Sequence, residues 1–427
     1  MSFIFSSKVT QKKDRKIHII GAGISGLIAA KVLEEAGYFP IIIESSEEVG
    51  GRIKTKIHDG YQLDVGFQVL LTEYPQALKH LNYEDLKLQK LLPGACIFKN
   101  KQQIIIGNPI RNISFLMPTL FSDIINYSDR YKIIKLYLYI RLKSFDKIFK
   151  SDEISTIEYL ENYGFSKKII NYFFKPFFSG VFLETKLETS SRMFEFVFKM
   201  FAKGHVAIPQ FGIQEIPNQI ANKLTKTTFK FNTKVEKVNE GEIILEDKSI
   251  IESDFTIIAS EIKNLFNDFE YSPIKWKGCI NFYFETEKKS ISNALIGLVP
   301  EKNTVINNLF YFSSIFSKSK GCKELLSVTV IDSKKYTNEA LTQQVINELK
   351  EHCNINVIRL IKQFNIPKSL PNLKGLSYKK DFSKFQLSKS IFLAGDSLLN
   401  GSLNAAMISG EMSAIQLTKV DNFNMSK

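Results

Sequence analysis

The chain has 427 residues and a formal net charge of +13, and 44% of its residues are hydrophobic and 24% charged. This composition excludes a disordered or fibrous protein, and the length exceeds what one hydrophobic core usually supports, so we expect two domains. Lysines are spread along the whole chain without a nucleic-acid-binding motif. The positive charge therefore indicates a solvated surface and no nucleic-acid partner.

The cysteines and histidines give no sign of a disulfide framework or a metal site. Cys96, Cys279, Cys322 and Cys353 are far apart, and the five histidines show no metal-ligand spacing. This usage predicts a reducing compartment. The apolar cluster at 3–5 is too short for a signal peptide, and no run of roughly 18 apolar residues could span a membrane, so we expect a cytoplasmic protein.

The clearest pattern begins near the N-terminus and predicts a β-α-β unit. The short apolar run at 16–20 is typical of a buried parallel strand. A glycine-rich turn follows, then apolar residues at helical spacing over 27–36 and a second apolar run at 40–44. The turn consists of Gly21, Ala22, Gly23, Ile24, Ser25 and Gly26.

Each part of this unit suits a dinucleotide. Gly21 permits the tight turn out of the strand, Gly23 lets the backbone approach a pyrophosphate, and Gly26 lets helix and strand pack closely. The pyrophosphate would lie at the positive end of the helix. Glu44 ends the second strand, where a carboxylate accepts from ribose hydroxyls and repels a 2′-phosphate. The following run 50–52, Gly-Gly-Arg, suits a second phosphate contact.

The rest of the chain alternates between extended and helical patterns. We expect extended chain at 61–71, mostly helix over 109–201 and short strands over 229–258. Residues 276–376 mix strands with a helix, and 391–414 predict a strand, a loop and a helix. No internal repeat or low-complexity linker separates these regions, so the domains are expected to interleave.

Two stretches offer apolar surfaces with two interpretations each. Residues 130–150 predict a basic amphipathic stretch, which suits either a domain helix with one wet face or a peripheral contact with an anionic membrane. Its expected apolar face contains Ile133, Ile134, Leu138, Phe145 and Phe149. A second group of aromatic residues could form helix core or line a channel for an apolar substrate. This group is Phe173, Phe174, Phe177, Phe178 and Phe182.

The run 19–53 resembles the FAD fingerprint of flavin amine oxidases, protoporphyrinogen oxidases and phytoene-type carotenoid desaturases. Segments 174–182, 209–221 and 392–410 resemble the same superfamily, and 64–75 looks most like its desaturase branch. The resemblance covers most of the chain. It implies an FAD-dependent oxidoreductase.

The resemblance also implies a fold of the α/β plus α+β class. A Rossmann-like FAD-binding domain would interleave with a substrate domain of mixed sheet and helices. Residues 14–108, 203–272 and 385–420 would form the FAD-binding domain. Residues 109–202 and 273–384 would form the substrate-binding domain.

Further roles follow from the resemblance alone. Glu44 would bind the adenosine ribose, Arg52 would lie near the phosphates or the flavin, and Val235 would touch adenine through its backbone. Asp396 would bind the pyrophosphate or ribityl region, and a helix N-terminus at 405–407 would lie under the flavin ring. The expected FAD contacts are Gly21, Ala22, Gly23, Ile24, Ser25, Gly26, Glu44, Ser45, Gly51, Arg52, Val235, Gly395, Asp396, Asn404, Ala405, Ala406 and Met407.

This sequence departs from the family pattern at one notable place. Gln68 stands where the desaturase pattern usually has His, so any chemistry of that His is absent or altered here. No Cys lies near the C-terminal motif, so FAD is expected to be held non-covalently, and no catalytic residue is assigned. The leading hypothesis is a desaturase or dehydrogenase of a hydrophobic, isoprenoid-like substrate. The alternatives are a flavin amine oxidase, a protoporphyrinogen oxidase-like enzyme and a flavin-free binding protein of the same fold.

Overall fold

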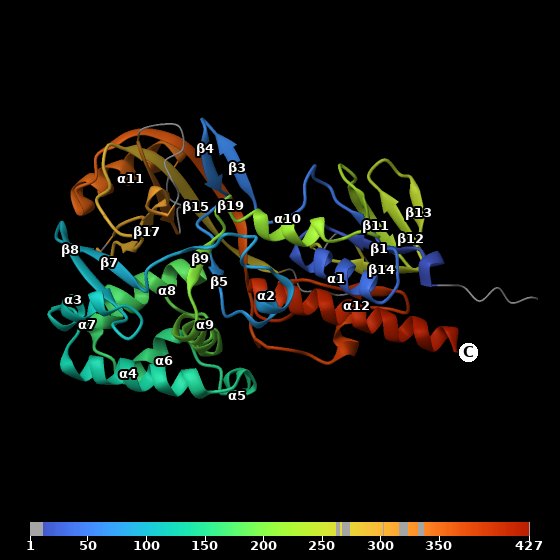
Figure 1. Ribbon diagram of the computed structural model, residues 1–427, viewed down its shortest axis with the longest axis horizontal. Coiled ribbons are helices and arrows are strands. Elements are labelled where there is room, and N and C mark those ends of the chain that lie inside the picture. The colour runs from blue at the N-terminus through green and yellow to red at the C-terminus, as the bar shows by residue number, and fades with distance from the viewer. Residues whose placement is uncertain are drawn as a thin grey trace, which may run out of the picture.

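One lobe of the computed structural model is built on a five-stranded parallel sheet (Figure 1). Its strands, in spatial order, are β10 (Thr228–Lys230), β2 (Ile41–Ile43), β1 (Ile17–Ile20), β14 (Phe255–Ile258) and β20 (Ile391–Leu393). Because all five strands run in the same direction, the loops that follow them lie at one edge of the sheet. The structure describes residues 12–261, 265–266, 274–301, 303–315, 323–331 and 337–426, and Cys322 lies outside these ranges.

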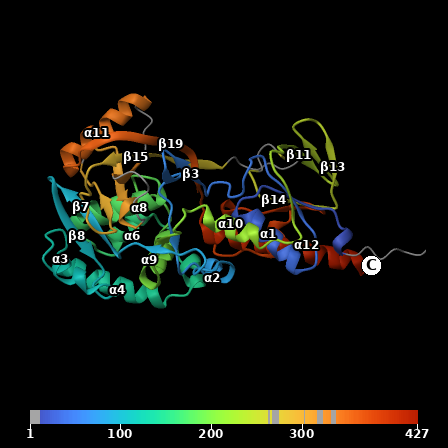
Figure 2. The same cartoon turned by 45° about the horizontal axis from the view of Figure 1, so that its top comes forward.

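Helices α1 (Ile24–Glu35) and α12 (Leu403–Met425) lie side by side against this sheet, as both views show (Figures 1 and 2). Two glycines permit the close approach. A Cβ on Gly26 would lie 2.1 Å from the carbonyl oxygen of Gly21, and a Cβ on Gly410 would lie 2.2 Å from that of Ser25. The first and last helices of the chain therefore share one packed interface.

The other lobe contains a seven-stranded mixed sheet, in which β16 (Ile296–Leu298) and β7 (Gly94–Lys99) are paired in parallel and the other described neighbours are antiparallel. Helix α11 (Asn338–Cys353) packs on it through Leu341, Val345 and Leu349. The strands, in spatial order, are β19 (Val357–Asn372), β15 (Lys275–Thr286), β18 (Glu324–Val330), β17 (Ile306–Tyr311), β16 (Ile296–Leu298), β7 (Gly94–Lys99) and β8 (Gln102–Gly107). The strands at 94–107, which the sequence analysis placed in the FAD-binding domain, are thus paired in the sheet of the second lobe. The division of the chain into two discontinuous domains stays a prediction.

A layer of helices occupies the side of this lobe away from α11 (Figure 1), and the helical expectation for 109–201 is confirmed. The helices are α3 (Leu116–Leu120), α4 (Tyr127–Leu142), α5 (Phe145–Lys150), α6 (Thr156–Asn162), α7 (Lys167–Ile169), α8 (Lys175–Phe182) and α9 (Ser191–Lys203). The lobe therefore combines a mixed sheet with helices, as expected for the substrate domain.

The prediction of one amphipathic stretch over 130–150 is wrong. The helix ends at Leu142, and a new helix begins at Phe145 because the Ser144 side chain accepts a hydrogen bond from the Lys147 N–H. Phe149 is buried and packs edge to face on Phe196. The residues placed on one face by sequence therefore belong to two helices with different surroundings.

The other strands and helices are short. The short sheet β5-β9-β6 lies between the lobes in Figure 1. The remaining elements are β3 (Thr55–His58), β4 (Tyr61–Asp64), β5 (Leu70–Leu71), β6 (Gln89–Lys90), β9 (Val206–Ile208), β11 (Val235–Asn239), β12 (Glu242–Leu245), β13 (Ile250–Glu252), α2 (Pro75–His80) and α10 (Glu215–Asn222). Within the described residues, no helix is long and apolar enough to cross a bilayer.

Candidate functional site

A cavity of about 1120 Å³ extends from the carboxyl edge of the parallel sheet into the helical layer of the other lobe. Pockets for one small molecule usually measure roughly 300–1,000 Å³. The space therefore exceeds what one small molecule usually occupies. Its sheet end and its helical end have different linings, and we describe them in turn.

The sheet end is shaped by the turn after β1. Gly21, Gly23, Ile24 and Ser25 line the cavity, and no side chain caps helix α1 at Gly23. The first N–H groups of that helix therefore stay open to a ligand, at the positive end of its dipole. A Cβ built on Gly23 meets nothing within 4 Å, so this backbone faces open space. These features fit the pyrophosphate of a dinucleotide.

Glu44 is held in place by the loops on both sides of it. One carboxylate oxygen accepts from the Ala22 N–H (2.7 Å), and the other accepts from the N–H and the hydroxyl of Ser46 (both 2.8 Å). The side chain is buried but still lines the cavity. Its position at the end of β2 fits a carboxylate that accepts from ribose hydroxyls.

An ion pair joins the N-terminal and C-terminal motifs. Arg52 Nη2 lies 2.5 Å from Asp396 Oδ1, and Arg52 Nη1 donates to the Ser369 carbonyl (3.1 Å). The Arg52 guanidinium also lies 5.2 Å from the centre of the Trp276 ring. Residues from loops far apart in sequence, together with β15 and β19, therefore surround the same part of the cavity.

The structure brings most of the expected FAD contacts to this cavity. Those that line it are Gly21, Gly23, Ile24, Ser25, Glu44, Ser45, Gly51, Arg52, Gly395, Asp396 and Ala406. Those that do not line it are Ala22, Gly26, Val235, Asn404, Ala405 and Met407. Val235 packs against the core that also contains Ile20, Ile43 and Ile258.

The start of α12 explains three of the residues that do not line the cavity. The Ser402 hydroxyl caps the helix by accepting from the Ala405 N–H (3.0 Å), and Asn404 accepts from the Gln76 N–H (3.0 Å). Both groups are thus used inside the protein, and Met407 is fully buried. Ser402 and Leu403 line the cavity instead. A serine before an apolar helical run is a recognised N-cap, so the sequence did contain this signal.

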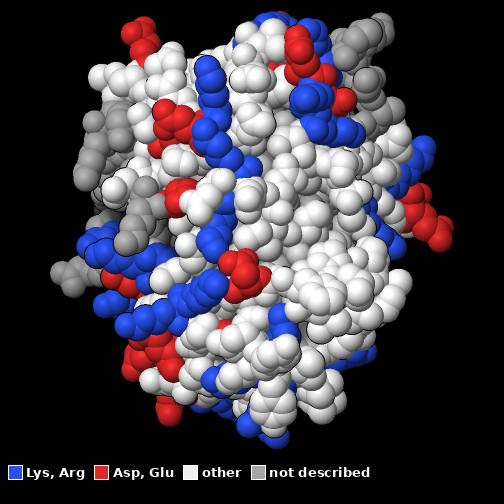
Figure 3. Space-filling view, turned by 90° about the vertical axis from the view of Figure 1, so that its left-hand side faces the viewer, with Lys and Arg blue, Asp and Glu red and all other residues white. Residues whose placement is uncertain are grey.

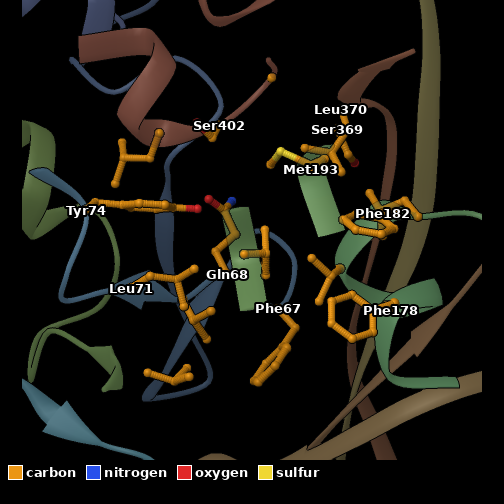
Figure 4. A pocket seen from close by; sticks show the side chains of 18 of the residues that line it. Phe67, Gln68, Leu71, Tyr74, Phe178, Phe182, Met193, Ser369, Leu370 and Ser402 are labelled. Carbon is orange, nitrogen blue, oxygen red and sulfur yellow. The ribbon is translucent and has the colours of Figure 1, made fainter. Parts of the chain in front are cut away.

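The helical end of the cavity is mainly apolar. Phe67, Phe178, Phe182 and Met193 surround it in Figure 4. Of the aromatic group singled out by sequence, Phe173, Phe177, Phe178 and Phe182 line the cavity, whereas Phe174 is buried in the core. The lining also includes Ile133, which sequence analysis placed on the apolar face of 130–150. Further lining residues that sequence analysis did not single out are Ile106, Val181, Val197, Phe198 and Phe201.

Gln68 lies at the junction of the two ends. Its Nε2 donates to the carbonyls of Val65 (2.9 Å) and Arg52 (3.0 Å), so it ties two cavity loops together. The hydroxyl of Tyr74 points toward Gln68 in Figure 4, while the Tyr74 ring stacks on Phe196. An amide does not take up a proton near neutral pH. Gln68 therefore positions the loops and cannot act as a base.

Asp64 ends strand β4, directly before the loop that carries Gln68, and it is buried. Its Oδ1 accepts from the Thr55 hydroxyl (2.6 Å) and the Ile213 N–H (3.0 Å), and burial raises the pKa of this carboxyl to about 6. Its folded pKa thus lies above the unfolded value. Ionised Asp64 therefore destabilises the fold above about pH 6, and this penalty fades as the pH falls toward 4.

We expect Asp64→Asn to flatten the pH dependence of stability. Asparagine stays neutral and keeps an oxygen for Thr55 and Ile213. Measured by urea unfolding, the stability of the variant relative to the wild type should be greater at pH 8 than at pH 4, by up to about 3 kcal/mol. Parallel stability curves over this range would contradict the assignment.

The part of the chain that the structure describes contains no group of three or more His, Cys, Asp or Glu side chains that could hold a metal ion. Among the described residues that line the cavity, the carboxylates are Glu44, Glu261 and Asp396. Each of them follows a strand of the parallel sheet. The arrangement can therefore hold an extended dinucleotide at one end and an apolar molecule at the other.

Comparisons with known proteins agree with this arrangement. The pattern of one protein family, described as flavin containing amine oxidoreductase, matches residues 24–417. Protoporphyrinogen oxidase 2 of Arabidopsis thaliana is 23% identical over 171 residues, which cover 39% of this chain and 32% of that protein. The 15-cis-phytoene desaturase of Narcissus pseudonarcissus is 36% identical over 76 residues, which cover 18% of this chain and 13% of that protein. The matches thus span at most about a third of these relatives' length.

A solved structure of a putrescine oxidase shares the fold. It superposes with a TM-score of 0.69 at 14% sequence identity, covering 95% of this chain and 99% of that chain. At this identity the likeness concerns the fold alone.

Proposed function

We propose that this chain, which belongs to the flavin-containing amine oxidoreductase family and is an FAD-dependent oxidoreductase, desaturates or dehydrogenates a hydrophobic, isoprenoid-like substrate. The observation that carries the proposal is the apolar helical end of the cavity, which opens directly onto the dinucleotide end. A long apolar molecule placed there loses its hydration shell, and this burial provides its binding energy.

The charge of the cavity argues against a simple amine as the substrate. The carboxylates of the described lining all follow strands of the parallel sheet, at the dinucleotide end. The helical end offers a protonated amine no carboxylate, and its described charged lining residues are Arg111 and Arg130. An ammonium group would therefore lose its solvation without gaining a partner there. Two relatives are named for hydrophobic substrates, phytoene and protoporphyrinogen, which supports the same direction.

The roles of this chain's residues follow from their positions. FAD, when bound, supplies the acceptor for a hydride equivalent from the substrate. The open N–H groups of α1 and the carboxylate of Glu44 would hold the pyrophosphate and the ribose. Gln68 would fix the loops beside the reacting end, and Phe178 and Phe182 would orient the substrate and exclude water. No cysteine in the described lining lies on the C-terminal motif, which supports non-covalent binding.

An anaerobic reduction screen tests the proposal. The purified protein should be yellow and should release FAD on denaturation. Its visible absorption should bleach with polyene or other apolar isoprenoid substrates and stay unchanged with putrescine or benzylamine. Bleaching by the amines alone would replace the proposal with an amine oxidase, and bleaching by protoporphyrinogen alone would favour a porphyrinogen oxidase.

The mouth of the cavity carries an exposed apolar surface, which we call the apolar collar. It lies on α3, α4 and the segments before them, and four of its members, Ile110, Leu116, Leu120 and Ile134, also line the cavity. The collar consists of Ile110, Ile113, Leu116, Met117, Leu120, Phe121, Tyr127, Tyr131, Ile134, Leu138, Tyr139 and Leu142. Figure 3 shows that this end of the molecule has a broad uncharged area with Lys and Arg side chains beside it.

We infer that the apolar collar docks peripherally on an anionic membrane. Contiguous exposed apolar surface marks an interaction site, and cations beside it attract anionic headgroups. Because four collar residues also line the cavity, an apolar substrate could pass from the bilayer to the cavity along apolar side chains.

We expect Phe121→Asp to weaken membrane binding. The Phe121 side chain is 79% exposed, and losing its burial in lipid should lower partitioning into vesicles of phosphatidylglycerol and phosphatidylcholine by roughly tenfold or more. Co-sedimentation with the vesicles measures the effect. Ile57→Asp is the matched control, because Ile57 is 73% exposed on β3 and lies outside the collar. Equal loss in both variants, or a change of oligomeric state in place of vesicle binding, would contradict the membrane contact.

A further inference from the structure

The charged residues of the cavity lining divide into two groups. Three cations of the lining have an acidic partner: Arg52 pairs with Asp396, Lys277 with Glu184 (2.9 Å), and Lys368 with Glu261. At the helical end, Arg111 and Arg130 line the cavity and form no ion pair with a carboxylate of the described residues. Glu73 attracts Arg111 from beyond ion-pair distance, so among the described residues neither arginine has a carboxylate in direct contact.

Arg111 is held rigidly by the end of helix α9. Its Nη1 donates to the carbonyls of Phe201 (2.9 Å) and Gly204, and its Nη2 donates to Nδ1 of His205 (3.0 Å). Arg has five N–H donors, so the guanidinium retains Nε–H and one Nη2–H. In a guanidinium, Nε–H and one Nη2–H lie along the same edge, and this edge can bind a carboxylate through two parallel hydrogen bonds.

His205 contributes a further donor beside Arg111. Because Arg111 donates to Nδ1, the proton of the neutral ring lies on Nε2. Burial and the charges of Arg111 and Lys90 lower the pKa of His205, which keeps the ring neutral. Burial lowers the pKa of Arg111, and the charge of Arg141 lowers it further. Tyr137 and Glu73 raise this pKa. The guanidinium stays charged in any case, because its ordinary pKa is so high.

We propose that the substrate of this cavity carries a carboxylate on its apolar body, and that Arg111 and His205 bind this group while Arg130 attracts it to the cavity mouth. The proposal rests on the proposed function and narrows its substrate class. The aromatic walls accept the apolar body, and the two cations at the same end favour an anion. An uncharged hydrocarbon would leave the desolvated Arg111 guanidinium without a carboxylate in direct contact.

Dodecanoate and methyl dodecanoate are suitable probes, because they share one apolar chain and differ in charge at one end. The FAD-loaded wild-type protein should bind dodecanoate at least tenfold more tightly than the ester, measured by calorimetry or by the change in the visible flavin spectrum. Equal affinity for the two compounds would overturn the proposal without any substitution. Absence of flavin from the protein would instead count against the proposed function, so the two failures can be distinguished.

Variants locate the carboxylate site. Arg111→Gln should weaken dodecanoate binding by roughly tenfold or more and leave the ester unchanged, so that the preference disappears. Arg111→Lys keeps the charge without the planar fork and should retain part of the preference, which also controls for the loss of the α9 contacts. Lys135→Gln removes an exposed positive charge of α4 outside the cavity lining and should behave like the wild type.

An anionic lipid headgroup could also bind Arg111 through its negative charge. Binding to vesicles distinguishes a lipid headgroup from a substrate carboxylate. If Arg111 binds the substrate, Arg111→Gln should bind phosphatidylglycerol vesicles as the wild type does. Loss of vesicle binding in Arg111→Gln, together with equal affinity for dodecanoate and its ester, would show that the cation serves the membrane, and the proposal would be wrong.

Discussion

Replacing Gly23 with leucine should yield a folded protein that binds no flavin. Gly23 lies at the start of α1, and a Cβ there meets nothing within 4 Å, so the protein itself tolerates a side chain. That open space is where the pyrophosphate is expected to approach the helix N-terminus. A leucine side chain would fill the space and abolish FAD binding, which the visible spectrum of the purified protein would reveal directly.

Gly26 offers a matched comparison three residues later. A Cβ on Gly26 would lie 2.1 Å from the Gly21 carbonyl oxygen, which is backbone and cannot move aside. Gly26→Ala should therefore destabilise the fold by about 3 kcal/mol or more, whereas flavin-free Gly23→Leu should differ from the flavin-free wild type by only ~0.5 kcal/mol. Urea unfolding of the flavin-free proteins measures both values. Retention of FAD by folded Gly23→Leu would show that the pyrophosphate binds elsewhere.

Removing the carboxylate of Glu44 should weaken flavin binding and stability together. Glu44 accepts from the N–H groups of Ala22 and Ser46, so Glu44→Ala leaves both donors without this partner. Each such loss costs about 1–3 kcal/mol, and the flavin-free variant should be destabilised by about 2–4 kcal/mol. Loss of the ribose contacts should also weaken FAD affinity by roughly 30- to 100-fold.

Two further variants separate these effects. Glu44→Gln keeps an amide oxygen as an acceptor and should recover much of the stability but less of the FAD affinity. Glu47→Ala removes an exposed carboxylate from the same loop and should leave both quantities unchanged. Fluorescence titration of the flavin-free proteins with FAD gives the affinities. Wild-type affinity in Glu44→Ala would remove Glu44 from the dinucleotide site.

The local parts of the fold followed from local patterns. The strand near 16–20, the helix after Gly26 and the strand near 40–44 lie where the apolar periodicity indicated, because each depends on neighbouring residues. The strands β12 and β14 agree with the expected runs for the same reason. The break at Ser144 was missed, although a serine cap was visible, because the apolar residues on both sides of it suggested one continuous helix.

The site residues divide in the same way. Gly21, Gly23 and Glu44 were correctly predicted to line the site. The glycine spacing and the acidic residue at the strand end both belong to one β-α-β unit, so they are recognisable from consecutive residues. Trp276 and Ser369 were missed because they come from β15 and β19 and meet Arg52 only through tertiary packing. Ser402 was missed in favour of Asn404, since the choice depends on which side of α12 faces the cavity.

The dinucleotide-binding unit and the family resemblance could be recognised from local patterns alone, because a glycine turn between strand and helix acts through backbone geometry over a few residues. Which cations lack an acidic partner in direct contact, and where apolar residues stay exposed, became visible in the folded chain. Those properties depend on distances between segments far apart in the chain: Lys277 finds Glu184 and Arg52 finds Asp396, whereas Arg111 meets backbone carbonyls and a histidine. Charge balance in a cavity is set by packing, and no local pattern records it.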